Sequence, residues 1–134
     1  MTVLRPLRDD ELSEDAAEVF ADIRATRGTD FVNNIWRCLA HDPPALASTW
    51  ARVKAVMVVG REDGLDPLTK ELIYLAVSVA NGCSYCAHSH TAAARAKGMT
   101  DAQYAELLAI VALASSTNGL VTAMQLPVDP EFQV

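Results

Sequence analysis

The chain has 134 residues, of which 51% are hydrophobic and 21% are charged, and its formal net charge is −6 at pH 7. This length and composition predict one folded domain over residues 1–134, with its core at about residues 50–113, rather than a disordered segment. The acidic balance and the scattered basic residues argue against a nucleic-acid partner.

The segment at the N-terminus mixes charged with apolar residues and lacks the apolar core of a signal peptide. The longest near-apolar stretch, residues 72–80, is too short to cross a bilayer. We therefore expect a soluble, cytoplasmic protein that does not associate with a membrane.

Helix-start and helix-stop residues divide the chain into helices, which predicts an all-α bundle of about six to seven helices. The expected helices cover residues 13–27, 30–42, 43–60, 67–80, 83–97 and 100–117, with a short seventh helix to about residue 125. The pair Asn118-Gly119 is the predicted break between the last two, and little is expected to order the tail from Pro127.

A buried strand is the alternative for residues 72–79, because an apolar run of this length fits either a strand or a buried helix. A strand before Cys-x-x-Cys and a helix would be a thioredoxin-like arrangement. The Asp66-Pro67 helix start and the lack of further strand patterns favour the helix.

Two of the three cysteines, Cys83 and Cys86, stand three residues apart at the predicted start of a helix. The positive end of a helix dipole favours a thiolate. On a helical wheel Cys83, Cys86 and His90 occupy one stripe, and Cys86 and His90 form an i, i+4 pair. The pattern predicts thiol–disulfide chemistry with an imidazole that moves protons.

The preceding helix is apolar almost all round, so the carboxylate of Glu71 stands out on it. It shares a face with Leu68, Tyr74, Leu75 and Ser78. The tight Asn81-Gly82 connection predicts a helical hairpin that places Glu71 and His90 at similar depths. We expect Glu71 to orient or charge the imidazole.

The remaining chemistry-bearing side chains have simpler interpretations. Tyr85 and His88 point away from the stripe and are candidate site-lining residues, and Cys38 is expected to be a plain buried thiol. Half of a zinc site is the alternative interpretation of Cys83 and Cys86, but a structural zinc site normally needs four ligands. We expect no metal and no cofactor, since no flavin or haem motif is visible.

The segment Glu71, Cys83-x-x-Cys86, x-x-x-His90 resembles the alkylhydroperoxidase D-like branch of the carboxymuconolactone decarboxylase family. The resemblance covers roughly residues 50–113 and is most specific between residues 71 and 97. It implies an all-α homo-oligomer, often a trimer or a hexamer. Well-characterised members have a histidine between the cysteines, where this chain has Tyr85.

The resemblance also implies a thiol peroxidase activity. Cys86 matches the cysteine that attacks the peroxide, Cys83 the one that closes the disulfide, and His90 and Glu71 the proton relay. The implied partners are a hydroperoxide and an external dithiol donor of thioredoxin-like or lipoyl type.

Three other functions remain open from the residues: a cofactor-free lactone decarboxylase, a metal-binding module, and a redox-responsive protein without turnover. The cysteine pair argues against the decarboxylase, because that chemistry needs no dithiol.

Overall fold

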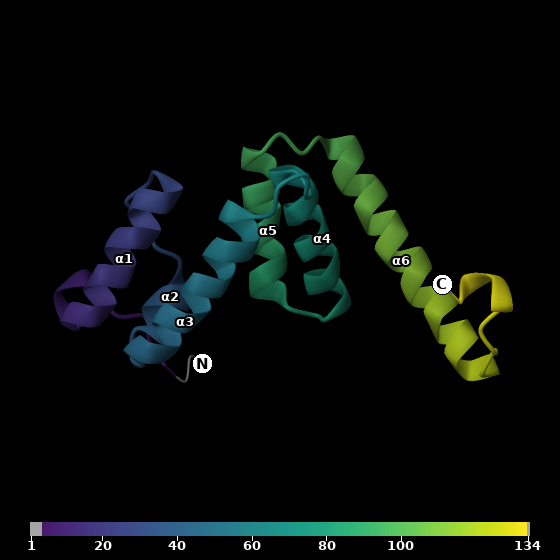
Figure 1. Ribbon diagram of the computed structural model, residues 1–134, viewed down its shortest axis with the longest axis horizontal. Coiled ribbons are helices and arrows are strands. Elements are labelled where there is room, and N and C mark those ends of the chain that lie inside the picture. The colour runs from purple at the N-terminus through teal and green to yellow at the C-terminus, as the bar shows by residue number, and fades with distance from the viewer. Residues whose placement is uncertain (1–3, 134) are drawn as a thin grey trace. The chain divides into compact units, whose positions relative to one another are not determined.

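A computed structural model describes residues 4–133, and every regular element in them is helical (Figure 1). The all-α prediction is therefore confirmed, and the strand alternative for residues 72–79 is wrong. The chain folds as two compact units, a first that ends at Glu62 and a second that begins at Asp63. Each has its own cluster of buried apolar side chains, and one domain over the whole chain stays a prediction.

The first unit contains a 3₁₀ turn, Asp9–Glu11, three α-helices and a π-helical segment, Lys54–Val59. Its α-helices are α1 (Glu14–Arg27), α2 (Asn34–Leu39) and α3 (Pro43–Val53). The side chain of Ser13 caps α1, and Gly28 ends it with a φ of 66°, a left-handed conformation that glycine adopts without strain.

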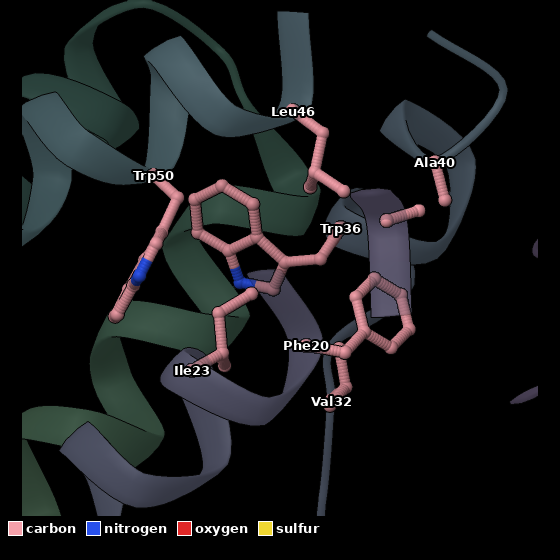
Figure 2. Close-up of a cluster of buried hydrophobic side chains, with 8 residues drawn as sticks. Phe20, Ile23, Val32, Trp36, Ala40, Leu46 and Trp50 are labelled. Carbon is pink, nitrogen blue, oxygen red and sulfur yellow. The ribbon is translucent and has the colours of Figure 1, made fainter. Parts of the chain in front are cut away.

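The core of the first unit consists of apolar side chains from α1, α2, α3 and the segments that flank α2 (Figure 2). Phe20, Ile23 and Leu46 are fully buried, and the rings of Trp36 and Trp50 meet edge to face with centroids 5.5 Å apart. Two aromatic residues therefore anchor the contact between α2 and α3.

Helix α2 starts later than predicted, at Asn34 rather than near Asp30. Val32 is 1% exposed in the segment before the helix, and the Asp30 carbonyl accepts a hydrogen bond of 2.9 Å from Arg24 Nε. Burial of Val32 and capture of this carbonyl favour the non-helical entry, which local propensity does not reveal. The third helix ends at Gly60 as predicted, although its last turns are π-helical.

The second unit consists of α4 (Pro67–Ala80), α5 (Ser84–Ala96), α6 (Asp101–Met124) and a 3₁₀ turn, Pro130–Phe132. The Asp66 side chain accepts from the Thr69 amide and begins α4 where the sequence predicts it. Helices α4 and α5 form the expected hairpin through Asn81 and Gly82, and Gly82 takes a φ of 69° at the turn. The core of this unit consists of buried side chains from the three helices and from the connection between α5 and α6: Leu75, Ala94, Met99 and Leu107.

Helix α6 runs to Met124 without the predicted break at Asn118-Gly119. A glycine inside a helix costs only about 1 kcal/mol relative to alanine, which the surrounding intrahelical hydrogen bonds readily offset. The helix ends instead where Gln125 adopts a left-handed conformation, with a φ of 50°.

Helix α6 bears on the expectation that the protein does not associate with a membrane, which considered residues 72–80 alone. Among residues 4–133, α6 is the one helix long and apolar enough to cross a bilayer by length and composition, and 6% of its apolar window is buried. Core helices of soluble proteins share this length and apolar character, so α6 is weak evidence for a membrane span.

Candidate functional site

The turn between α4 and α5 places Cys83 at the N-cap of α5. Its amide donates to the Ser78 carbonyl over 2.9 Å, and its Sγ accepts from the Cys86 amide over 3.3 Å. The sulfur thus occupies the position at which a helix N-terminus stabilises negative charge. The cysteine pair lies at the start of a helix, as the spacing predicts.

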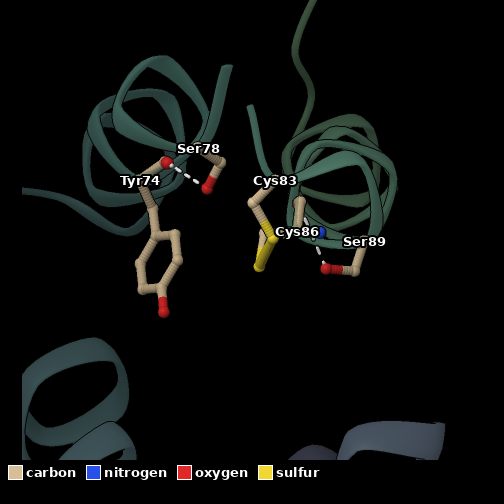
Figure 3. The surroundings of a disulfide bond; sticks show 5 residues. All are labelled: Tyr74, Ser78, Cys83, Cys86 and Ser89. Carbon is tan, nitrogen blue, oxygen red and sulfur yellow. Dashed lines mark hydrogen bonds between the residues drawn. A yellow bond between two sulfur atoms is a disulfide. The ribbon is translucent and has the colours of Figure 1, made fainter. Parts of the chain in front are cut away.

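Cys83 and Cys86 are joined in a disulfide, with their Cα atoms 5.3 Å apart. Both residues are partly buried. Figure 3 shows the disulfide on α5 and the Tyr74 side chain on α4 projecting toward the same side of the hairpin. The backbone therefore brings the two cysteines close enough to form an intramolecular disulfide.

Glu71 on α4 and His90 on α5 are in direct contact, with 2.7 Å between His90 Nδ1 and Glu71 Oε2. Glu71 is only 6% exposed, and the His90 side chain is mostly covered. A buried carboxylate needs polar partners, and the imidazole supplies one. The hairpin thus brings together the two residues that the sequence placed at similar depths.

A third polar residue, which the sequence interpretation missed, completes the surroundings of Glu71. Lys97 Nζ lies 2.9 Å from Glu71 Oε1, so each carboxylate oxygen has its own cationic or N–H partner. Lys97 follows His90 by seven residues, a spacing that keeps both on one helix face. This spacing was the one feature of the sequence that could have indicated Lys97 as a site residue.

Burial raises the pKa of Glu71, but the hydrogen bonds from His90 and Lys97 and their charges outweigh it. The net pKa therefore lies below the usual carboxyl value. Near neutral pH, Glu71 is ionised and accepts both hydrogen bonds. With Nδ1–H donating to Glu71, the other ring nitrogen of neutral His90 carries a lone pair that can take up a proton.

The imidazole of His90 is also stacked against an aromatic ring. The ring centroids of Tyr74 and His90 are 3.7 Å apart, at an interplanar angle of 21°. The sequence placed Tyr74 on the same face as Glu71, but gave no reason to connect it with the histidine. Hydrogen bond and stack together hold the imidazole in one orientation.

The other candidate residues differ in exposure. Tyr85 and His88 are exposed on α5. Cys38 is half-buried rather than buried, and its Sγ donates to the Leu4 carbonyl over 3.4 Å. Among residues 4–133, no group of three or more His, Cys, Asp or Glu side chains is arranged to hold a metal ion.

An open hollow of about 290 Å³ lies beside Cys83, between the end of α4 and the start of α5. Its walls are mainly apolar and come from Ser78, Val79, Gly82, Cys83, Ser84 and Ala87. One sulfur of the pair thus borders a surface depression.

Known proteins resemble this chain in both sequence and structure. The carboxymuconolactone decarboxylase family matches residues 44–129. A solved structure titled alkylhydroperoxidase AhpD core, from Rhodospirillum rubrum, is 66% identical, with a TM-score of 0.94 over 100% of this chain and 98% of that chain.

Two curated relatives are named alkyl hydroperoxide reductase AhpD. The protein from Solibacter usitatus is 35% identical over 74% of this chain and 54% of its own length. The protein from Corynebacterium kroppenstedtii is 28% identical over 87% of this chain and 67% of its own length. The chain thus spans about half to two thirds of the length of these relatives.

Proposed function

The chain belongs to the carboxymuconolactone decarboxylase family, and on that premise we propose that it is a thiol-dependent hydroperoxidase. One observation carries the proposal: a disulfide-forming Cys83–Cys86 pair shares a helical hairpin with a buried, hydrogen-bonded Glu71–His90 pair. The names of the relatives from Solibacter usitatus and Corynebacterium kroppenstedtii point to an alkyl hydroperoxide as the substrate.

The first step is proton transfer followed by attack on the peroxide. His90, oriented by Glu71, takes the thiol proton of Cys86, directly or through water. The thiolate attacks the distal oxygen of the hydroperoxide, and the O–O bond breaks. The alkoxide that leaves takes the proton back from His90, so the products are an alcohol and a sulfenic acid on Cys86.

The second step closes the disulfide. The Cys83 thiol attacks the sulfenic sulfur, water leaves, and the Cys83–Cys86 bond forms. An external dithiol then restores both thiols by exchange and is itself oxidised to a disulfide. A thioredoxin-like or lipoyl-type donor has the required two thiols.

Assembly into a homo-oligomer, a trimer or a hexamer, is part of the proposal. Large apolar side chains are exposed on α4 and α6, among them Val77 at 52%, Ile110 at 60% and Leu113 at 65%. Contact with further copies would remove this apolar surface from water. Sedimentation at micromolar concentration tests this point, and a monomer would contradict it.

The test of the activity is a thiol titration before and after one equivalent of an alkyl hydroperoxide. The reduced protein has three thiols, and we expect one to remain, that of Cys38. Cys86→Ser should keep both of its thiols. Cys83→Ser should lose one and give a trappable sulfenic acid.

A matched control and a rival assay complete the experiment. Cys38→Ser should lose both remaining thiols as fast as the wild type loses two. Full peroxide turnover by Cys86→Ser, with a dithiol donor supplied, would refute the assignment. Decarboxylation of a γ-lactone acid by Cys86→Ser at the wild-type rate would instead favour the other activity in the family name.

A further inference from the structure

The carboxylate of Glu71 divides its two oxygens between two partners, one on α5 and one at the C-cap of that helix. Oε2 accepts from His90 over 2.7 Å, and Oε1 accepts from Lys97 over 2.9 Å. We propose that Lys97 is a positioning residue: its ammonium group keeps Glu71 ionised and aimed at His90, so that His90 can act as the base. This inference rests on the proposed peroxidase function.

The fold holds Lys97 in place at the end of α5. Its amide donates to the carbonyls of Ala93 and Ala94, and Gly98 turns the chain with a φ of 93°. Met99 then enters the core at 4% exposure. A cation at a helix C-terminus is also stabilised by the helix dipole. The ammonium group is therefore directed at Glu71 by an anchored backbone.

The side chain of Lys97 is 37% exposed, whereas that of Glu71 is 8% exposed. A buried carboxylate with His90 as its only partner would share a proton with the ring and release it only at higher pH. The charge of Lys97 stabilises the state in which Glu71 is ionised and His90 is neutral. Only that state can accept a thiol proton.

The other charged and titratable groups of the surrounding helices have different roles. On α4, Tyr74 stacks on His90, and Lys70 is not among the groups with the largest effects on the pKa of Glu71. On α5, Arg95 lies 2.6 Å from Asp101 of α6 and over the ring of Tyr104. Arg95 thus offers a control cation on the same helix that is engaged elsewhere.

The test compares Lys97→Met with Lys97→Arg and with the control Arg95→Met. The titration of the His90 ring is followed by NMR in the oxidised protein, where Cys83 and Cys86 carry no titratable thiol. We expect Lys97→Met to raise the His90 midpoint by about half to one pH unit, since a nearby positive charge is lost. Lys97→Arg should stay near the wild type, and Arg95→Met should move the midpoint much less.

Turnover supplies the second measurement. On the acid side of its pH profile, Lys97→Met should lose peroxidase rate by about three- to ten-fold, the fraction of base lost by such a shift. The rate should return toward that of the wild type as the pH rises. A purely structural defect would lower the rate at every pH.

Two results would overturn the inference: an unchanged or lowered His90 midpoint in Lys97→Met, or an equal shift in Arg95→Met. The rings of His41 and His88 serve as references in the same spectra. A wild-type protein that consumes no hydroperoxide would refute the peroxidase proposal instead, because the NMR titration needs no turnover.

Discussion

Replacement of Glu71 by glutamine keeps the size of this buried side chain and removes its charge. The glutamine oxygen can accept from either His90 or Lys97, but its NH2 group can only donate. If the oxygen accepts from Lys97, the NH2 group meets His90 as a donor, and His90 keeps this contact only by moving its proton off Nδ1. If the oxygen accepts from His90, the contact with Lys97 is lost. The substitution tests the polar centre of the α4–α5 hairpin with little change in packing.

A hydrogen bond to a charged group contributes about 1.5–3 kcal/mol. Glutamine also removes the cost of burying a carboxylate, and the Lys97 side chain is 37% exposed, so solvent weakens its ion pair. We therefore expect Glu71→Gln to lower the free energy of unfolding by about 1–2 kcal/mol at pH 7.

The pH dependence has a defined sign. The pKa of Glu71 is lowered in the folded protein, so its ionised form stabilises the fold above the usual carboxyl pKa. This stabilisation is lost as the pH falls through the lowered pKa. Protonated glutamate resembles glutamine, so the difference between the two proteins should shrink toward zero in acid.

Hydrogen exchange of the α4 and α5 amides at several pH values is the suitable assay, because both tryptophans lie in the first unit. Glu106→Gln, at an exposed position of α6, is the matched control and should change little. If the free energy of opening of these amides differs between wild type and Glu71→Gln by the same amount from pH 7 into acid, the reasoning is refuted, since such a difference could not come from the carboxylate charge.

Three further substitutions have expected outcomes. Tyr74→Leu should lower the steady-state peroxidase rate, because the His90 ring loses the aromatic ring stacked on it at 3.7 Å. Tyr74→Phe should keep the wild-type rate, since the stack needs a ring and not the hydroxyl. Leu75→Ala should lower the free energy of unfolding, measured in urea, by about 2–5 kcal/mol, because removal of this 0% exposed side chain leaves a cavity. A smaller loss would show that neighbouring side chains move in and fill the cavity. Thr100→Ala should cost about 1 kcal/mol in the same assay through loss of the α6 cap, and Thr100→Ser should restore it.

Helix boundaries set by nearby residues could be predicted from the sequence, whereas those set by tertiary packing could not. The cap at Asp66, the stop at Gly28 and the turn at Gly82 depend on residues within one or two turns, and the sequence predicts them. The late start of α2 depends on the burial of Val32. The continuous α6 shows that Asn118-Gly119 is too weak a signal to end a long helix.

The same distinction between local and tertiary interactions applies to the residues of the candidate site. The wheel of α5 places Cys83, Cys86 and His90 on one stripe because the helical period is known in advance. Lys97 extends that stripe, but only the position of α4 shows that its ammonium group reaches Glu71.

By itself, the sequence determined the all-α fold, the cysteine pair at the start of α5 and the hairpin that joins α4 to α5. These features follow from caps, turns and a helical period that act over a few residues. The tertiary structure alone decided that Lys97 also reaches Glu71 and that Tyr74 stacks on the imidazole. Those contacts depend on how two helices are rotated against each other, and the packing of the whole second unit sets that rotation.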